Sequence, residues 1–226
     1  MRNFNKNRFL RGLSHALLLQ GLVFISLLGD VGYLVPVLTV HSEPASSSKS
    51  RVYKILPGAS QVRFNGSSPF DKFTGTTSQA EGFIEGDINA ITKEPSTEVK
   101  AEVRVDAKSL DTGNEGRDKN MRKTLDVEKY PLITFRLSRA SLIEKSSGAG
   151  PSKYKVEGTL SIHGVDRPIT VEVTSKMEAS RITISGKMPL DITDYKIDPP
   201  KVPVLFFVRM DKNVTVEFTL VAEAAS

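Results

Sequence analysis

Two kinds of side chain alternate without interruption in the ten residues from Thr97 to Asp106. One face of this stretch carries Thr, Val, Ala, Val and Val, and the other carries only charged residues. Only a β-strand, with its side-chain period of two, separates such a pattern into one dry and one wet surface. Because a dry face must be covered, the chain must contain further elements that enclose a common interior.

The same period recurs along most of the chain. Eight further segments show it, and short turn signals separate them: 52–55, 61–67, 81–91, 131–138, 153–164, 168–174, 181–190 and 213–222. Strands at this spacing are typical of an all-β barrel or sandwich. Gly82 and Gly86 interrupt one segment, and glycines inside strands often mark bends or bulges.

One connection breaks the pattern, between Asp106 and Pro131. Asn114 predicts the cap of a short helix that begins near Glu115 and closes near Thr124, since asparagine side chains accept hydrogen bonds from the first helical amides. Met121 and Leu125 share one face of that helix. Two interpretations stay open: a plug or lid at one end of a barrel, and a connector that shields a sheet edge.

Composition excludes several functions. The chain has no Cys, which rules out disulfides, thiol catalysis and thiolate metal sites. The net charge of +5 falls to about +3 without the N-terminal segment, and the remaining charges are interspersed, so no nucleic-acid-binding patch is evident.

The N-terminus is predicted to be a targeting segment, residues 1–45, followed by a folded domain, residues 46–226. A basic head with Arg2, Lys6, Arg8 and Arg11 precedes a long apolar run, the arrangement of a secretory signal peptide. Cleavage is expected between Ser42 and Ser50, with export of the remainder. The alternative is an uncleaved anchor, because residues 12–40 are long enough to span a bilayer.

Several ordered motifs resemble the YceI-like family. They are V-D-A-K-S-L-D-T-G-N-E-G-R-D-K-N-M-R at 105–122, L-D-V-E-K-Y-P-L-I-T-F at 125–135, G-T-L-S-I-H-G-V-D-R-P-I-T-V at 158–171 and L-D-I-T-D-Y-K-I at 190–197. The resemblance covers about residues 52–222. It implies an extended, eight-stranded, antiparallel, lipocalin-like barrel in the bacterial periplasm, with a long isoprenoid or quinone-like lipid inside and no enzyme activity. The segment 198–213 and the lack of Trp depart from the family pattern.

The interior itself stays ambiguous from the residues alone. An eight-stranded barrel either packs solid or holds one slender ligand, and the dry faces mix large residues with glycines. With the resemblance, a tunnel for a polyisoprenoid, quinone-like or fatty-acid-like lipid is expected, with no metal, cofactor or catalytic residue. Each lining residue alone could equally be ordinary core. The predicted lining comprises Phe64, Phe83, Val103, Val105, Met121, Leu125, Tyr130, Phe135, Leu137, Leu160, Ile162, Ile184, Met188, Phe206 and Phe218.

Other features carry weaker hypotheses. The apolar run at 202–208 is interpreted as a flap, a membrane-touching edge or the first half of the last strand. Tyr130 and Tyr195 could offer a hydroxyl to a lipid head group. His163 and the aspartates of 191–198 are interpreted as turn residues. A ligand-free structural or stress-response barrel, and an enzyme acting on the lipid, stay open as alternatives; transient membrane contact and a homodimer are also considered.

Overall fold

The computed structural model describes residues 50–202 and 205–225, and for residues 202–208 it describes no side chains. The predicted targeting segment, residues 1–45, therefore lies outside the described residues. Within the described ranges, no helix is both long enough and apolar enough to cross a membrane.

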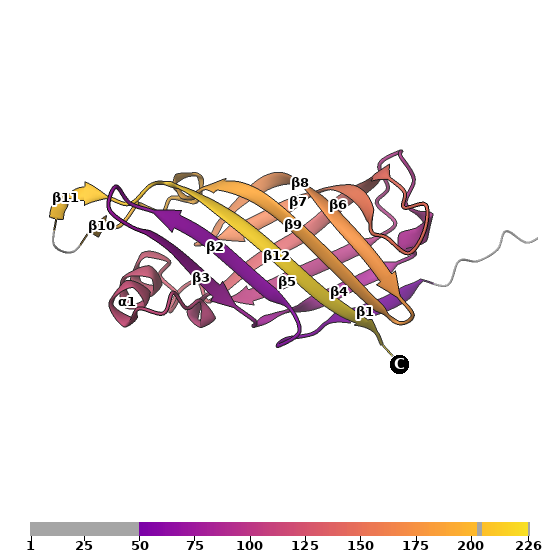
Figure 1. Ribbon diagram of the computed structural model, residues 1–226, viewed down its shortest axis with the longest axis horizontal. Helices are drawn as coiled ribbons and strands as arrows, with labels where there is room; N and C mark the ends of the chain where they lie inside the picture. Colours follow the sequence, from indigo (N-terminus) through magenta and orange to yellow (C-terminus); the bar gives the residue numbers. More distant parts are fainter. Residues whose placement is uncertain (1–49, 203–204, 226) are drawn as a thin grey trace, which may run out of the picture. The chain divides into compact units, whose positions relative to one another are not determined.

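Strands dominate this region, in the order expected from the alternating segments (Figure 1). The longest strands are in the second half of the chain. The strands are β1 (Arg51–Ile55), β2 (Gln61–Ser67), β3 (Lys72–Thr77), β4 (Ala80–Gly86), β5 (Lys100–Asp106), β6 (Leu132–Glu144), β7 (Ser152–Ile162), β8 (Val165–Glu178), β9 (Arg181–Asp191), β10 (Lys201–Val202), β11 (Leu205–Arg209) and β12 (Asn213–Ala224). The helices are η1 (Ile88–Ala90), η2 (Ala107–Ser109), α1 (Glu115–Thr124) and η3 (Ile192–Tyr195).

Ten of the strands form one antiparallel sheet that closes into a barrel. Its order is β1-β4-β5-β6-β7-β8-β9-β12-β2-β3, and β1 also pairs with β12. β1 and β2 pair with different parts of β12, and β4 and β3 pair with β1 and β2 in turn. Each of these two pairs of segments takes the place of one strand, so the ten segments make eight strands around the barrel. The predicted eight-stranded antiparallel barrel with one short helix is thus confirmed.

One part of the barrel wall lacks backbone pairing. β8 and β9 pair only from Val173 opposite Gly186 to Glu178 opposite Arg181. Beyond that point residues 165–172 pair with β7 alone, and residues 187–191 pair with β12 alone. We call this stretch the seam. Pro168 and Pro189 lie one on each side of it, and proline has no N–H to donate to a ladder.

Side-chain contacts close the seam in place of backbone hydrogen bonds. Val171 of β8 and Met188 of β9 belong to one buried apolar cluster with Val173. At its far end the guanidinium Nε of Arg167 donates to the carbonyl oxygen of Asp194 at 2.8 Å. The seam is therefore bounded at both ends and apolar between them.

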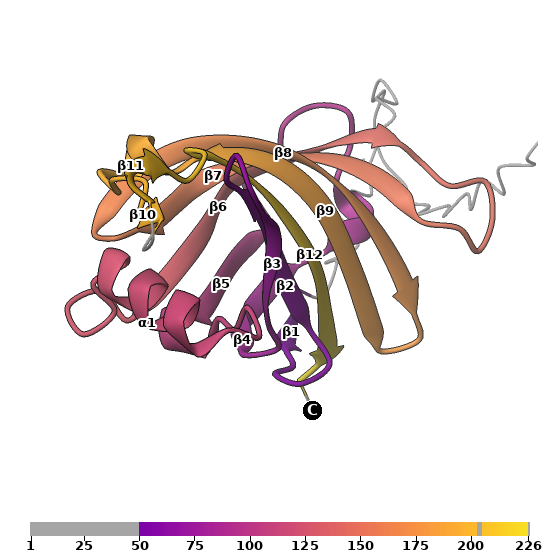
Figure 2. The ribbon, with the colours of Figure 1, turned by 60° about the vertical axis from the view of Figure 1, so that its left-hand side comes forward.

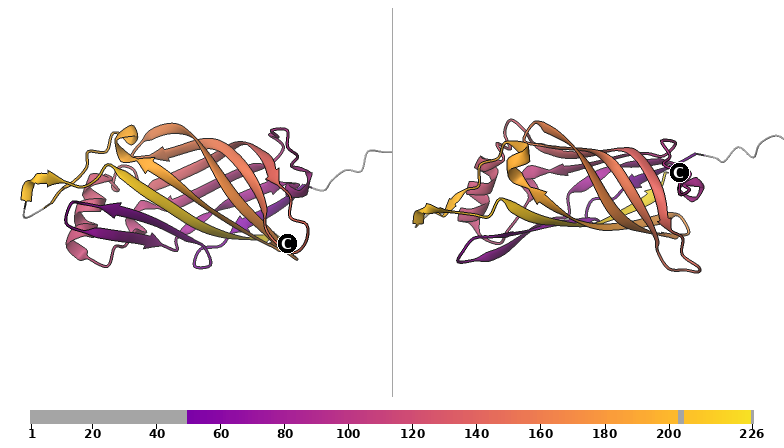
Figure 3. Two further views of the ribbon diagram at one scale, coloured as in Figure 1. Left: turned by 45° about the horizontal axis from the view of Figure 1, so that its top comes forward. Right: turned by 90° about the horizontal axis from the view of Figure 1, so that it is seen from above.

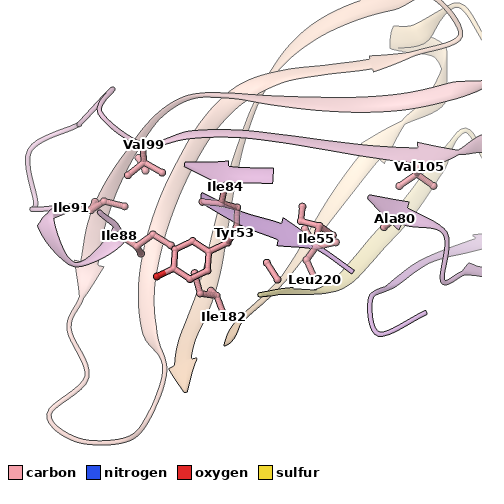
Figure 4. Packing of buried hydrophobic residues seen from close by; sticks show 12 residues of the cluster. Tyr53, Ile55, Ala80, Ile84, Ile88, Ile91, Val99, Val105, Ile182 and Leu220 are labelled. Atoms are coloured by element: carbon pink, nitrogen blue, oxygen red, sulfur yellow. The ribbon is translucent and has the colours of Figure 1, made fainter. Parts of the chain in front are cut away.

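The end of the barrel remote from α1 contains a cluster of buried apolar side chains. Tyr53, Ile84, Ile182 and Leu220 meet there from four strands, each at most 7% exposed (Figure 4). Ile88 and Ile91, in and just after η1, add a cover from outside the sheet. We call this cluster the plug. Burying an aliphatic side chain stabilises a fold by about 1.5–3 kcal/mol, so the plug is a main source of the barrel's stability.

Glycines let large rings lie against the inner wall. The ring of Phe218 on β12 lies over Gly186 on β9, where an added Cβ would approach the ring to 2.5 Å. The ring of Phe135 on β6 lies in the same way over Gly158 on β7. Both rings point into the barrel, and they lie between the plug and the end of the barrel near α1.

Candidate functional site

A cavity of about 760 Å³ occupies the half of the barrel near α1. Its walls come from seven strands of the barrel, from α1, and from the segment around η3. Figures 2 and 3 show α1 at the same end of the barrel as β10 and β11. The residues from the barrel strands are apolar, and they are Val62, Phe64, Phe73, Val105, Ile133, Leu160, Ile162, Leu190, Val214 and Val216. The volume lies within the range of about 300–1,000 Å³ that is usual for small-molecule sites.

Helix α1 forms a polar wall opposite these strands. It begins as predicted, because the Asn114 side chain accepts a hydrogen bond from the Arg117 amide at 2.9 Å. It closes at Thr124, and Met121 is its one apolar side chain toward the cavity. The polar residues that it contributes to the lining are Asn114, Arg117, Lys119, Asn120 and Thr124.

A buried carboxylate fixes the start of this helix. Asp118 is 5% exposed, and its Oδ1 accepts hydrogen bonds from the Thr112 amide at 3.0 Å and the Thr112 hydroxyl at 2.6 Å. Burial works to raise the pKa of Asp118, but the Thr112 hydrogen bonds outweigh it and hold this pKa below its usual value. The helix is thus anchored to the preceding loop from its first turn.

An arginine ties α1 to the β2–β3 hairpin across the mouth of the cavity. A guanidinium nitrogen of Arg117 lies 3.2 Å from a carboxylate oxygen of Asp71, and its Cζ lies 4.4 Å from the centre of the Phe73 ring. The ion pair is partly exposed, so it contributes little to stability. Together the two contacts fix the position of a charged group at the rim of an apolar chamber.

The segment after β9 supplies a buried tyrosine to the opposite wall. Tyr195 is 2% exposed and lines the cavity, and its hydroxyl has no hydrogen-bond partner among the described residues. Burial, with a smaller contribution from Asp194, raises the pKa of Tyr195 to about 12. A neutral phenol in an apolar chamber is suited to donate one hydrogen bond to a ligand oxygen.

A carboxylate holds the turn that carries this tyrosine. Asp191 accepts hydrogen bonds from the Thr193 amide at 2.9 Å and from the Lys212 ammonium at 2.6 Å. The Lys212 ammonium first, and then Thr193, lower the pKa of Asp191 to about 2. The interpretation of this aspartate as a turn residue is confirmed, since it caps η3. In the described part of the chain, no three His, Asp or Glu side chains lie together in a way that could hold a metal ion.

His163 also has a local structural contact. It lies in the β7–β8 turn with φ of 52°, and its Nδ1 is 3.3 Å from the carbonyl oxygen of Tyr195. Its ring meets Tyr130 edge to face at 4.9 Å. Tyr130 packs over Gly164 and does not line the cavity, so Tyr195 is the tyrosine available to a head group.

The structure divides the predicted lining into groups. Six residues surround the cavity: Phe64, Val105, Met121, Leu125, Leu160 and Ile162. Six others lie one or more layers nearer the plug or against the seam: Val103, Phe135, Leu137, Ile184, Met188 and Phe218. For Phe206, the side chain lies outside what the structure describes.

Phe83 is misplaced in the predicted lining. It pairs with Lys54 and Glu102, side chains of the outer face, and it is 37% exposed. Its flanking residues Gly82 and Ile84 face inward instead. The segment that contains Phe83 includes two glycines with positive φ, 141° at Gly82 and 134° at Gly86, and the strand ends there in place of continuing to residue 91.

Sequence reasoning missed the polar half of the site. Lys119, Asn120, Lys201 and Asp211 line the cavity, and none was a candidate. Apolar alternation indicates only the strands of the barrel, whereas Lys119 and Asn120 lie on α1, Lys201 lies in the short strand β10, and Asp211 lies in the connection before β12. The capping residue Asn114 predicted where the helix begins. The nearly all-polar sequence of this helix was the signal that it does not pack into the apolar core.

A closed antiparallel barrel with an apolar chamber at one end and a polar rim defines the lipocalin-like class of small-molecule binding barrels. The model of the YceI-like domain matches residues 53–222, and this chain belongs to that family. Curated relatives include the UPF0312 proteins of Vibrio campbellii and Vibrio parahaemolyticus, each 30% identical over 129 residues. The match covers 51% of this chain and 65% of each relative, so it spans just under two thirds of their length.

Solved structures agree on the fold. BcnA of Burkholderia cenocepacia has a TM-score of 0.59 at 20% identity, over 74% of this chain and 98% of its own. A polyisoprenoid-binding domain from Saccharophagus degradans has a TM-score of 0.58 at 20% identity, over 76% of this chain and 98% of its own. These likenesses show the same barrel architecture.

Proposed function

We propose that this protein is an exported binding protein that holds an isoprenoid or a related amphipathic lipid inside its barrel. The observation that carries the proposal is the cavity of about 760 Å³ with apolar strand walls and a polar helix wall. Burying methylene groups there contributes about 0.8 kcal/mol each, so an apolar chain supplies the affinity and the polar wall orients the head.

The relatives support the same ligand class. The Saccharophagus degradans domain of this architecture is described as polyisoprenoid-binding. For the enzyme alternative, two titratable side chains at turns near the cavity have structural contacts: Asp191 caps η3, and His163 contacts the Tyr195 carbonyl. A ligand-free structural barrel is disfavoured because an apolar chamber left empty forfeits the packing that stabilises a core.

Export and membrane contact complete the proposal. The basic head and apolar run of residues 1–45 support transfer to the bacterial periplasm. Phe70 supports a membrane contact, because it is 70% exposed at the tip of the β2–β3 hairpin, beside the cavity mouth. A binding protein that meets the bilayer at its mouth can exchange lipid without passing it through water, as a carrier, store or sequestering protein would require.

Native mass spectrometry of the full chain tests the ligand. The protein purified from bacterial cells is expected to carry one chain-like lipid, which organic solvent removes and which added prenol replaces. A protein that carries nothing, and takes up no prenol after solvent treatment, would refute the proposal. Cell fractionation with N-terminal sequencing tests export: the expected product is periplasmic and begins between residues 43 and 51, and a cytoplasmic, uncleaved chain would contradict it.

A further inference from the structure

A groove of about 620 Å³ lies on the barrel wall where the pairing of β8 with β9 ends. Glu172 and Lys187, the first residue of each strand beyond the last pair, are exposed on the outer face, and both line this groove. Val173, Gly186 and Phe218 also line it, although all three occupy inward-facing positions of their strands. The groove therefore reaches into the wall between the two strands. We call it the outer groove.

One apolar cluster separates the outer groove from the cavity. Val171, Val173 and Met188 are its buried members, each at most 8% exposed. Val173 lines the outer groove, whereas Leu190, which packs against the same cluster, lines the cavity. Between these two spaces the wall along the seam thus consists of side-chain contacts, without backbone pairing of β8 to β9.

The seam is the part of this wall that can open without breaking a ladder. The register of the last β8–β9 pair, continued beyond it, places Val171 opposite Met188, and only apolar contacts act there. On the other side of β8, by contrast, β7 pairs with it without a break from Ser152 to Ile162. Parting β7 from β8 would leave a long row of backbone hydrogen bonds unmade, whereas parting β8 from β9 along the seam leaves none.

The seam also has a suitable direction. It runs lengthwise, from the mouth, where Arg167 contacts the Asp194 carbonyl, to the outer groove part-way along the barrel. A lipid whose head lies at the mouth can therefore enter sideways, with its chain parallel to the seam. An end-first chain instead has to pass the polar wall of α1 and the Arg117–Asp71 ion pair, which lies across the mouth.

We propose that the seam is a lateral gate through which the apolar chain of an isoprenoid or a similar lipid enters and leaves the cavity. The inference rests on the proposed function and specifies the route of its ligand. The cluster that contains Val171 and Met188 closes the gate. As the two strands part, the entering chain covers these side chains, so their apolar surface passes from one apolar partner to another without meeting water.

A disulfide across the seam tests the gate. The chain has no Cys, so Val171→Cys combined with Met188→Cys introduces a single pair of thiols. Stopped-flow fluorescence follows the uptake of a fluorescent polyene fatty acid from phosphatidylcholine vesicles by the full chain. We expect the oxidised protein to take up this probe at least about tenfold more slowly than the reduced protein, because a locked gate removes the opening step. Dithiothreitol should restore the rate.

A second disulfide is the matched control. Lys176→Cys combined with Thr183→Cys links two residues that already pair in the β8–β9 ladder. Its oxidation is expected to leave the uptake rate unchanged. The equilibrium affinity for the probe should be the same for the oxidised and reduced forms of both proteins, since the lock blocks the route and not the cavity.

A loosened seam gives the opposite perturbation and does not depend on disulfide formation. Met188→Ala removes apolar contacts from the cluster, so uptake and release should both become at least about threefold faster, since fewer methylene contacts hold the seam closed. Met177→Ala is the matched control on β8, because Met177 pairs with Ile182 in the ladder and is 37% exposed. It should change neither rate.

The outcomes separate this inference from the proposed function. Equal uptake rates of the oxidised and reduced Val171→Cys, Met188→Cys protein, with oxidation verified by thiol titration, overturn the gate and leave lipid binding intact. Unchanged rates in a folded Met188→Ala protein also overturn it, and this comparison decides if the disulfide does not form. Failure of the unmodified protein to bind the probe or any prenol overturns the proposed function, and the gate with it.

Discussion

Filling the cavity from one wall should weaken lipid binding strongly without harming the fold. Val214 lines the cavity opposite Leu190 and belongs to none of the packed clusters, so the space in front of it is open to the ligand. Val214→Phe adds four carbons, which at roughly 30 Å³ each take about 120 Å³, or one sixth of the cavity. Four ligand carbons lose their place, at about 0.8 kcal/mol each, or about 3 kcal/mol. Affinity should therefore fall by more than about a hundredfold.

Displacement of a fluorescent polyene fatty acid by geranylgeraniol measures this loss, and the absence of Trp keeps the protein's own emission low. Val52→Phe is the matched control, because Val52 is 40% exposed on the outer wall opposite Glu85. Both variants should keep the melting temperature of the unmodified protein. An affinity of Val214→Phe within a factor of five of the control, in a folded protein, would refute the assignment of this cavity as the lipid site.

Three further perturbations test the tyrosine in the cavity wall, the turn that carries it, and the tip of the β2–β3 hairpin. Tyr195→Phe removes a hydroxyl that has no hydrogen-bond partner among the described residues, so it should weaken binding of a prenol about tenfold and leave binding of the matching hydrocarbon unchanged in the same displacement assay. Asp191 has its folded pKa depressed to about 2, so its contribution to stability is present above its ordinary pKa of 3.8 and is lost as pH falls to 2. Asp191→Asn should accordingly flatten the fall in melting temperature over that interval, and an unchanged slope would contradict the assignment. Phe70→Ser should reduce flotation of the protein with lipid vesicles while preserving prenol binding; equal flotation would argue against membrane contact at the mouth.

Most of the barrel could be predicted from its period-two pattern, and the exceptions have physical causes. Nine segments with alternating residues became strands, because one face of each is buried. β3 was missed since Lys72–Thr77 contains a glycine and three threonines, which give no apolar alternation. The 202–208 run was equally ambiguous: β10 and β11 form a separate two-stranded sheet at the open end, not the start of the last strand.

The site was harder to predict than the fold. Alternation assigns a residue to the inside but does not say how far along the axis it lies, so Phe64 at the cavity and Ile184 in the core looked alike. Whether an inward residue lines the cavity or packs in a core cluster depends on which inward residues meet across the barrel. That arrangement follows from strand stagger, which one sequence does not specify. The closure of one end by Ile88 and Ile91 likewise depends on a connection and not on a strand.

The unpaired stretch between β8 and β9 has a consequence for the motion of the barrel wall. Backbone hydrogen bonds between all neighbouring strands would fix the circumference of a barrel. Here β8 and β9 are not paired along the seam, where Pro168 and Pro189 lie. Between its ends, the apolar cluster that includes Val171 and Met188 bridges it, and apolar contacts can slide where ladder hydrogen bonds would have to break. The Arg167–Asp194 hydrogen bond holds its far end. The circumference can thus widen by a small amount on one side, which lets a bulky guest settle without unfolding the strands that surround it.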